Sequence, residues 1–171
     1  MIFSIIVAAD SNGAIGLNGE MPWKKLTADL QFFKNTTMHH WCILGRKTYN
    51  ALGNRALPGR KFIVVTRDNT FTAADSIIAN SIVSAMNMNE IKNEEEVFIL
   101  GGGEIYKQAI PMVNRIYLTR IHSTFEGDTY FFIPDPENWE VVSRMDYEQD
   151  EKNPYKYSFI VFDKKANIRN I

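Results

Sequence analysis

Apolar, β-branched residues recur along the chain in short runs, at residues 2–9, 41–44, 61–66, 77–79, 97–100, 115–121, 139–143 and 156–162. Segments with helical spacing lie among these runs, at residues 28–38, 47–53, 83–90 and 104–110. Continuous apolar runs of four residues, such as Phe62 to Val65, are typical of strands that are covered on both faces. The alternation of strands and helices therefore predicts a mainly parallel sheet with helices packed against it.

The last third of the chain has a different pattern. Two apolar runs, around 139–145 and 156–162, are joined by the polar segment 146–154, which predicts an antiparallel hairpin at a sheet edge with a charged, solvated loop. The predicted fold class is α/β with three layers, in which about four helices flank a mixed, mostly parallel eight-stranded sheet. Because no linker is visible, we expect a single domain over 1–171, with a frayed tail at 164–171.

Composition narrows the possible functions. A net charge of −1 and 45% hydrophobic residues are typical of a globular protein and do not suggest a nucleic-acid surface. The single cysteine, Cys42, lies in an apolar run, so we expect a buried and unreactive thiol. The first apolar run is too short to span a bilayer, which favours a cytoplasmic location without membrane contact. Neither a metal-binding motif nor a nucleophile elbow is present, and the acidic run 94–96 suggests a solvated connection.

Asp29 is the strongest candidate for ligand binding. Thr27 is a plausible N-cap for the helix predicted at 28–38, which places Asp29 in or near the first turn. Helical spacing places Asp29 at the edge of a stripe formed by Leu26, Leu30, Phe33 and Thr37. A lone carboxylate beside apolar groups costs free energy unless a ligand donates hydrogen bonds to it. The alternative is that the helix dipole alone favours an acidic residue here.

Glycines and cations follow three of the predicted strands. The run 97–100 leads into Gly101, Gly102 and Gly103 and then a helix start, where backbone N–H groups can approach a phosphate, although a tight turn is the alternative. The other two strands are followed by Gly45, Arg46, Lys47 and Thr48 and by Thr66 and Arg67. Parallel strands would bring these ends to one edge, where ligands bind. The pattern suits a pyrophosphate and one further phosphate, as in NADPH, unless the cations are ordinary surface residues.

Several longer motifs then occur in a specific order and spacing. They are Ala14-Ile15-Gly16, Met21-Pro22-Trp23, Leu26 to Phe33, Leu44 to Thr48, Leu57-Pro58-Gly59-Arg60, Thr66-Arg67, Leu100 to Tyr106 and Glu126 to Thr129. Together they make the chain resemble dihydrofolate reductase of the bacterial chromosomal type over nearly its whole length. The resemblance implies NADPH-dependent reduction of 7,8-dihydrofolate to tetrahydrofolate. It further implies hydride transfer from nicotinamide C4 to pterin C6, with N5 protonated through water, in a monomeric antifolate target.

The resemblance also implies which residues form the site. The catalytic residues would be Asp29, Trp23, Tyr106 and Thr119. The substrate-binding residues would be Ile6, Val7, Asp29, Leu30, Phe33, Leu52, Leu57, Arg60, Leu100 and Thr119. The cofactor-binding residues would be Ala8, Ile15, Gly16, Gly45, Arg46, Lys47, Thr48, Thr66, Arg67, Gly101, Gly102, Gly103, Glu104, Ile105 and Tyr106. No residue is expected to bind a metal.

Some of these residues have specific roles in the family that the chain resembles. Asp29 would hydrogen-bond the 2-amino group and N3 of the pterin, with Thr119 donating to its carboxylate. Arg60 would pair with the α-carboxylate of the glutamate tail, and Tyr106 would lie beside the nicotinamide. The carbonyls near Ile6 and Leu100 would accept hydrogen bonds from the 4-amino group of antifolate drugs. The peptide bond between Gly101 and Gly102 is expected to be cis.

Two departures from the family pattern and two alternative functions remain. Glu104 stands where some relatives carry a basic residue near the 2′-phosphate, which leaves this charge to Arg46 and Arg67. The pair Lys24-Lys25 adds one residue to the segment at 13–25 that is expected to close over the nicotinamide. The alternatives are a related pterin or pyrimidine reductase with the same fold, and a nucleotide-binding module without catalytic activity.

Overall fold

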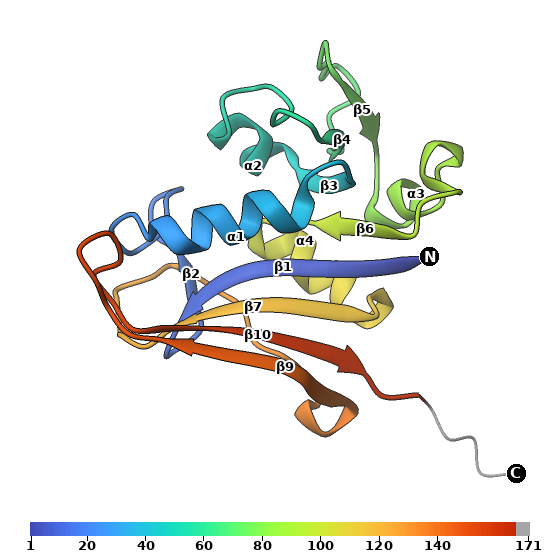
Figure 1. Cartoon of the computed structure of the whole chain (residues 1–171). Coiled ribbons are helices and arrows are strands. Elements are labelled where there is room, and N and C mark those ends of the chain that lie inside the picture. The colour runs from blue at the N-terminus through green and yellow to red at the C-terminus, as the bar shows by residue number, and fades with distance from the viewer. Residues whose placement is uncertain (167–171) are drawn as a thin grey trace, which may run out of the picture.

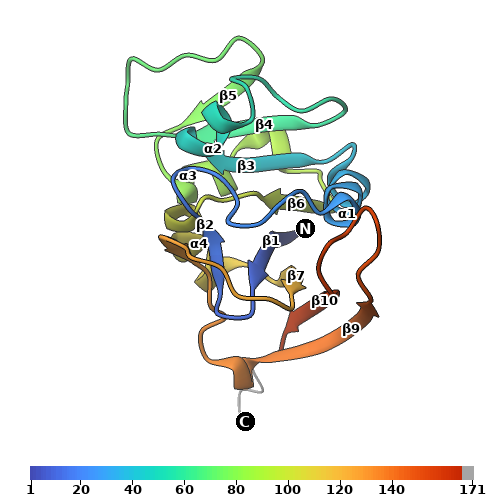
Figure 2. The ribbon, with the colours of Figure 1, turned by 90° about the vertical axis from the view of Figure 1, so that its left-hand side faces the viewer.

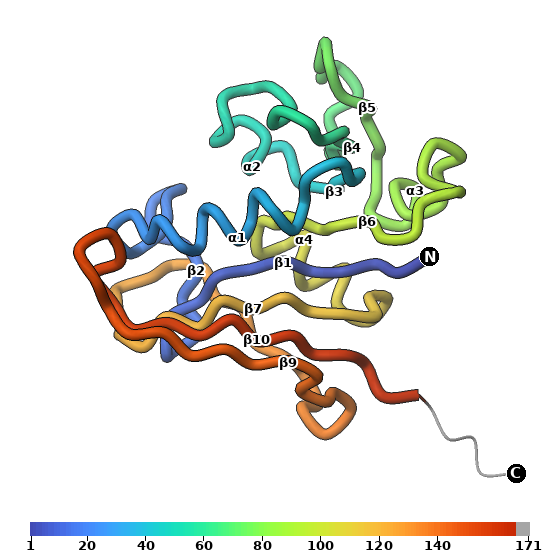
Figure 3. Tube along the Cα trace, viewed as in Figure 1, coloured from blue at the N-terminus to red at the C-terminus, as the bar shows by residue number. Residues whose placement is uncertain are grey.

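The computed structural model describes residues 1–166 of the chain. Its main sheet has eight strands in the order β5-β4-β3-β6-β1-β7-β10-β9. Their bounds are β1 (Ile2–Asp10), β3 (Trp41–Gly45), β4 (Lys61–Val65), β5 (Ser76–Ala79), β6 (Glu96–Ile99), β7 (Arg115–Ile121), β9 (Trp139–Tyr147) and β10 (Tyr157–Lys164). Every neighbouring pair from β5 to β7 is parallel, while β10 is antiparallel to both β7 and β9. The predicted mixed sheet and C-terminal hairpin are confirmed, and Figure 3 shows this hairpin at one edge.

Helices cover both faces of the sheet (Figures 1 and 2). They are α1 (Thr27–Thr37), α2 (Arg46–Ala51), α3 (Ile82–Met86), α4 (Gly103–Ala109) and the 3₁₀ turns η1 (Asn89–Ile91), η2 (Ile110–Met112) and η3 (Pro136–Asn138). Successive strand residues point to opposite faces, so Ile5 packs with α3 and α4 while Ile6 packs with α1 and α2. This alternation places an apolar core on each face of the sheet and confirms the predicted three layers. A third, smaller apolar cluster contains Trp23, Leu26, Ile121 and Tyr157.

Two local predictions need correction. The helix predicted at 83–90 is in fact α3 followed by η1, because the chain leaves the α-helical conformation after Met86. A second sheet, of β2 (Ala14–Gly16) and β8 (Thr129–Tyr130), was not predicted. These strands are too short to give a periodic pattern, and they form because their partners meet in the folded chain.

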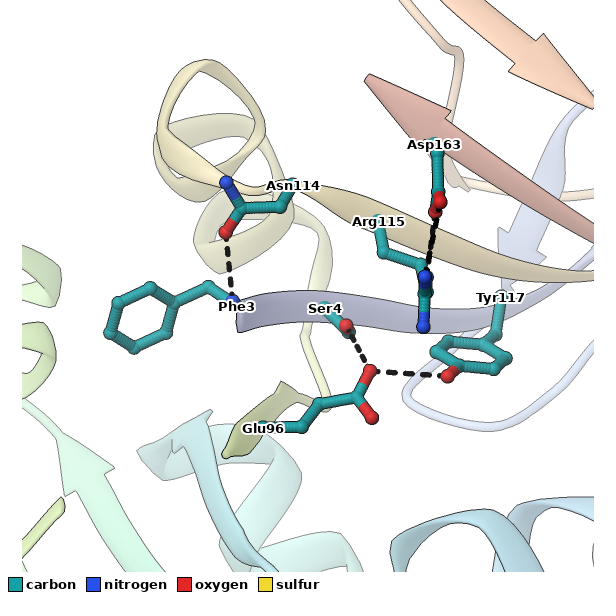
Figure 4. A network of polar contacts seen from close by, with 7 residues as sticks. All are labelled: Phe3, Ser4, Glu96, Asn114, Arg115, Tyr117 and Asp163. Atoms are coloured by element: carbon teal, nitrogen blue, oxygen red, sulfur yellow. Dashed lines mark hydrogen bonds and ion pairs between the residues drawn. The ribbon is translucent and has the colours of Figure 1, made fainter. Parts of the chain in front are cut away.

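The acidic run at 94–96 is only partly the solvated connection that the sequence suggests. Glu96 begins β6, and its carboxylate accepts hydrogen bonds from Ser4 Oγ at 2.5 Å and Tyr117 Oη at 3.1 Å. Figure 4 shows this cluster at the end of the sheet where β1, β6 and β7 begin, with the ion pair of Arg115 and Asp163 close by. Hydrogen-bond donors from neighbouring strands therefore hold this carboxylate at the sheet.

The C-terminal end of the sheet is ordered beyond the predicted boundary. Lys164 is the last residue of β10, and its backbone N–H donates to the carbonyl of Asn114 at 2.9 Å. Fraying therefore does not start at Lys164, while the part of this prediction that concerns 167–171 lies outside the described residues. No helix within residues 1–166 is long and apolar enough to cross a membrane. The single domain over 1–171 stays a prediction.

Candidate active site

An apolar hollow of about 190 Å³ lies between β1, α1, α2 and the end of β6. Its lining residues are Ile6, Val7, Ala8, Met21, Asp29, Leu30, Phe33, Thr48, Leu52, Leu100 and Tyr106. Most of the predicted substrate-binding residues are therefore brought together. Leu57 lies in the same apolar cluster as Phe33 and Leu52. Met21 and Thr48 also line the hollow, although neither was predicted to bind the substrate.

Asp29 is the one carboxylate in the lining of this hollow, and it is only 7% exposed. The buried face of α1 contains Asp29 and Thr37, while Leu30 is 42% exposed. The prediction that Asp29 lies at the edge of the buried stripe is therefore wrong, because the helix turns this carboxylate toward β7. Thr119 Oγ1, on β7, donates a hydrogen bond to Asp29 Oδ1 at 2.6 Å. The expected hydrogen bond between these residues is confirmed.

Burial dominates the electrostatics of Asp29. Removal from water raises the pKa of this carboxyl above its ordinary value, and the hydrogen bond from Thr119 lowers it by a smaller amount. A carboxylate has about four acceptor positions, and the hydrogen bond from Thr119 uses one of them. A ligand that brings further N–H donors into the hollow would therefore favour the ionised form.

The predicted N-cap at Thr27 is wrong. The N-cap position is Leu26, whose side chain cannot accept a hydrogen bond, and Thr27 is the first residue inside the helix. The backbone N–H of Ala28 donates instead to Oδ1 of Asn153, at 2.8 Å. Asn153 belongs to the loop between β9 and β10, and its contact with α1 could not be read from the local sequence.

Tyr106 closes the inner end of the hollow. Its Oη lies 2.7 Å from the carbonyl oxygen of Ile6 and 2.9 Å from that of Leu100, so its single proton is donated to one of them at a time. Burial, followed by the nearby carboxylate of Asp29, raises the pKa of Tyr106, and the phenol stays protonated at neutral pH. The two carbonyls expected to accept an amino group of antifolates thus lie side by side.

Trp23 lies beside Asp29. Both residues line a second hollow, of about 280 Å³, together with Met21 and Leu26. The Nε1 of Trp23 is the one buried side-chain polar atom without a hydrogen-bond partner within residues 1–166. A buried donor of this kind usually has a water or ligand partner.

Glycines connect the ends of β3 and β6 to the helices that follow them. The peptide bond between Gly101 and Gly102 is cis, as expected, and the carbonyl of Gly101 accepts from the N–H of Gly45 at 2.8 Å. Gly45 and Gly102 are the N-caps of α2 and α4, and neither helix has a side-chain cap. A Cβ atom on Gly102 would meet only Thr48 Oγ1, at 3.4 Å. The space before α4 is therefore open to a ligand, whereas a Cβ atom on Gly45, before α2, would meet Ile105 Cγ1 at 3.0 Å.

The predicted cations lie at the same edge because β3 and β4 are neighbours. Arg46 Nη1 pairs with Asp68 Oδ2 at 2.7 Å, and its guanidinium lies 4.5 Å from the centre of the Phe71 ring. Arg67 is exposed, as are Lys47 and Glu104. Of the remaining residues predicted to bind the cofactor, Ile105 has a buried side chain in the core beneath α4.

Arg60 lies near Phe33, next to the apolar hollow. Its Nη1 donates to Thr37 Oγ1 at 3.2 Å and its Nε donates to the carbonyl of Pro58 at 2.9 Å. The guanidinium lies 6.0 Å from the centre of the Phe33 ring, which lines the hollow. These bonds fix the direction of the guanidinium, and partial burial lowers the pKa of Arg60 from its ordinary value.

Comparison with known proteins identifies the family. The sequence model described as dihydrofolate reductase matches residues 2–164. The chain belongs to the dihydrofolate reductase family. It is 45% identical to the dihydrofolate reductase of Staphylococcus haemolyticus over 94% of this chain and 95% of the relative. It is 39% identical to that of Bacillus subtilis (strain 168), with 98% of each chain covered.

A solved structure agrees with the sequence relatives. A dihydrofolate reductase from Enterococcus faecalis, in complex with NADP(H) and RAB-propyl, matches with a TM-score of 0.87 and 36% identity, over 96% of this chain and 97% of that one. The resemblance noted in the sequence is confirmed, and so are the dihydrofolate reductase fold and activity: the protein reduces dihydrofolate with NADPH. The roles of individual residues remain predictions.

Proposed function

We propose that Asp29 anchors the pterin ring of dihydrofolate while C6 of that ring is reduced and N5 of that ring is protonated by a water molecule. When bound, NADPH supplies the hydride from its nicotinamide C4. The observation that carries the proposal is the buried carboxylate of Asp29, which faces an apolar hollow and accepts from one protein hydroxyl, that of Thr119. Such a group is costly to bury without donors, and the 2-amino group and N3 of a pterin supply two.

Asp29 acts in this proposal as an anchor and not as the direct proton donor to N5. Thr119 holds Oδ1 from β7, so the carboxylate presents its remaining acceptor positions to the ring. The negative charge beside the ring raises the proton affinity of N5 through space. The hollow that Trp23 and Asp29 both line supplies the space for a water next to Asp29, and Met21, which lines both hollows, controls access of water to it.

The ends of β3, β4 and β6 form the cofactor side of the proposed site. The starts of α2 and α4 suit the pyrophosphate, because the first-turn backbone N–H groups there have no side-chain cap. Arg46 and Arg67 supply positive charge for the 2′-phosphate, and Thr66 lies at the end of β4 directly before Arg67. Arg60 holds the glutamate carboxylate of the substrate through its planar fork of donors.

Antifolate inhibitors would occupy the same hollow, and an amino group of the inhibitor would donate hydrogen bonds to the carbonyls of Ile6 and Leu100. In that case the hydroxyl of Tyr106 lies beside the new hydrogen bonds, because it already contacts both carbonyls. A monomeric enzyme in the cytoplasm remains our expectation from the sequence.

The test is the loss of NADPH absorbance when the purified chain is mixed with dihydrofolate. The proposal expects turnover that requires both compounds and falls steeply in Asp29→Asn. Unchanged turnover in Asp29→Asn would overturn the anchoring role of the carboxylate.

A further inference from the structure

The loop between β9 and β10 reaches across to the start of α1. Asn153 is only 5% exposed, although it lies in a segment of otherwise polar and mostly exposed residues. Its Oδ1 accepts from the backbone N–H of Ala28 at 2.8 Å, across 125 residues of sequence. The prediction that 146–154 is simply a solvated loop is therefore wrong at this residue.

A tight turn fixes the direction of the Asn153 amide. Asp150 Oδ1 accepts from Nδ2 of Asn153 at 3.0 Å and from its backbone N–H at 2.8 Å. The backbone N–H of Asp150 in turn donates to the carbonyl of Asn153 at 2.8 Å. Because the amide nitrogen is held by a carboxylate, the amide oxygen is the atom presented to α1.

The start of α1 depends on this contact from outside. The first N–H groups of a helix have no partner within the helix, and a side-chain acceptor normally satisfies one of them. Leu26, at the N-cap, cannot do so. The residue after Ala28 is Asp29, so the capped turn also carries the carboxylate that Thr119 contacts from the opposite side.

We propose that Asn153 is a positioning residue for Asp29. It caps the first turn of α1 from the β9–β10 loop and thereby sets where the carboxylate lies relative to the hollow and to Thr119. The same loop also braces the segment before α1, since Tyr155 Oη accepts from the backbone N–H of Lys24 at 3.4 Å. This inference rests on the proposed role of Asp29 in binding the pterin.

The inference predicts a selective effect on the substrate. In Asn153→Ala the first turn loses its acceptor, and the KM for dihydrofolate should rise about fivefold, the equilibrium factor of a typical N-cap. The KM for NADPH should stay within about twofold of its original value, because the proposed contacts of NADPH lie at the ends of β3, β4 and β6. Binding of a diaminopyrimidine antifolate, measured by fluorescence quenching, should weaken together with the affinity for dihydrofolate.

A paired exchange provides the rescue. Asn153→Asp combined with Asp150→Asn keeps an acceptor oxygen for Ala28 without placing two carboxylates side by side, and the amide oxygen introduced at position 150 can still accept from the backbone N–H of residue 153. This double variant should restore the KM for dihydrofolate to within about twofold of the original value. Asn153→Asp alone should not, because it places two carboxylates side by side.

Two controls separate positioning from general stability. Ser81→Ala removes the side-chain cap of α3, which accepts from Ser84 N–H at 3.0 Å, and should lower the melting temperature without changing the KM for dihydrofolate. Lys152→Ala alters an exposed side chain of the same turn and should change neither quantity.

The inference is overturned if Asn153→Ala only lowers the melting temperature, if it raises both Michaelis constants equally, or if the double variant does not restore substrate binding. Its failure is distinguishable from failure of the proposed function. Asp29→Asn tests the role of the carboxylate directly and leaves the Asn153 contact unaltered.

Discussion

Replacement of Asp29 by asparagine should make the protein more stable and much less active. The change removes the negative charge and retains the shape of the side chain. Thr119 Oγ1 can still donate to the amide oxygen, so the one protein hydrogen bond to this group is preserved. What the variant loses is the buried charge, and that charge has opposite effects on folding and on catalysis.

The effect on stability follows from the raised pKa of Asp29. Between the ordinary aspartate pKa of about 3.9 and the raised native value, the folded chain binds more protons than the unfolded chain. The free energy of unfolding therefore falls as the pH rises through this window and stays lower above it. Each pH unit by which the pKa is raised corresponds to about 1.4 kcal/mol. For a chain of this size that is roughly 3–6 °C in melting temperature.

The effect on catalysis has the opposite sign. A hydrogen bond to a charged group contributes about 1.5–3 kcal/mol, and the pterin would make two to Asp29. Loss of the charge should weaken both of these hydrogen bonds. The value of kcat/KM for dihydrofolate should then fall by about 100-fold, since each tenfold change in rate corresponds to about 1.4 kcal/mol. Binding of NADPH should be retained, because its proposed contacts do not include the carboxylate.

Two measurements on the ligand-free and the working enzyme test this reasoning. Thermal melting without ligand should show Asp29→Asn above the original protein at pH 7, with the difference shrinking toward pH 4. The absorbance assay should show the loss of turnover at pH 7. Glu126→Gln, which neutralises an exposed acid, should change neither result. A variant that turns over dihydrofolate at the original rate, or that melts lower at pH 7, would refute the reasoning.

Three further predictions concern the periphery of the site and the core. Arg60→Leu should raise the KM for dihydrofolate at least tenfold more than the KM for NADPH, because it removes a charge-assisted pair of about 1.5–3 kcal/mol. Arg55→Leu serves as the control, and equal increases in the two KM values would argue against a carboxylate clamp. Arg67→Ala should lower the preference for NADPH over NADH about tenfold in kcat/KM, and an unchanged ratio would remove Arg67 from the 2′-phosphate site. Cys42 is fully buried, and burial raises the pKa of its thiol to about 12, so a thiol reagent at pH 8 should label the unfolded chain and spare the folded one; rapid labelling of the native protein would contradict this.

Local pattern determined much of the fold. The eight apolar runs all became strands of the main sheet. Inner strands such as β4 must be apolar because they are covered on both faces, whereas β9 is an edge strand with mostly exposed residues. The parallel order also placed the glycines and cations that follow β3, β4 and β6 at one edge, since the ends of parallel strands share an edge. Asp29 could be singled out as a lone acid beside apolar positions, which is a property of one short segment.

Tertiary structure decided the partners of these residues. Thr119 lies 90 residues from Asp29, and Asn153 lies 125 residues from Ala28, so neither hydrogen bond has a local signal. Both depend on which strands are neighbours and in what register. Glu96 is similar, since its donors come from β1 and β7. Periodicity specifies which face of an element is buried, whereas the polar atoms that meet at that face are set by the packing of distant segments. For this reason the cap of α1 comes from the β9–β10 loop and not from the neighbouring threonine.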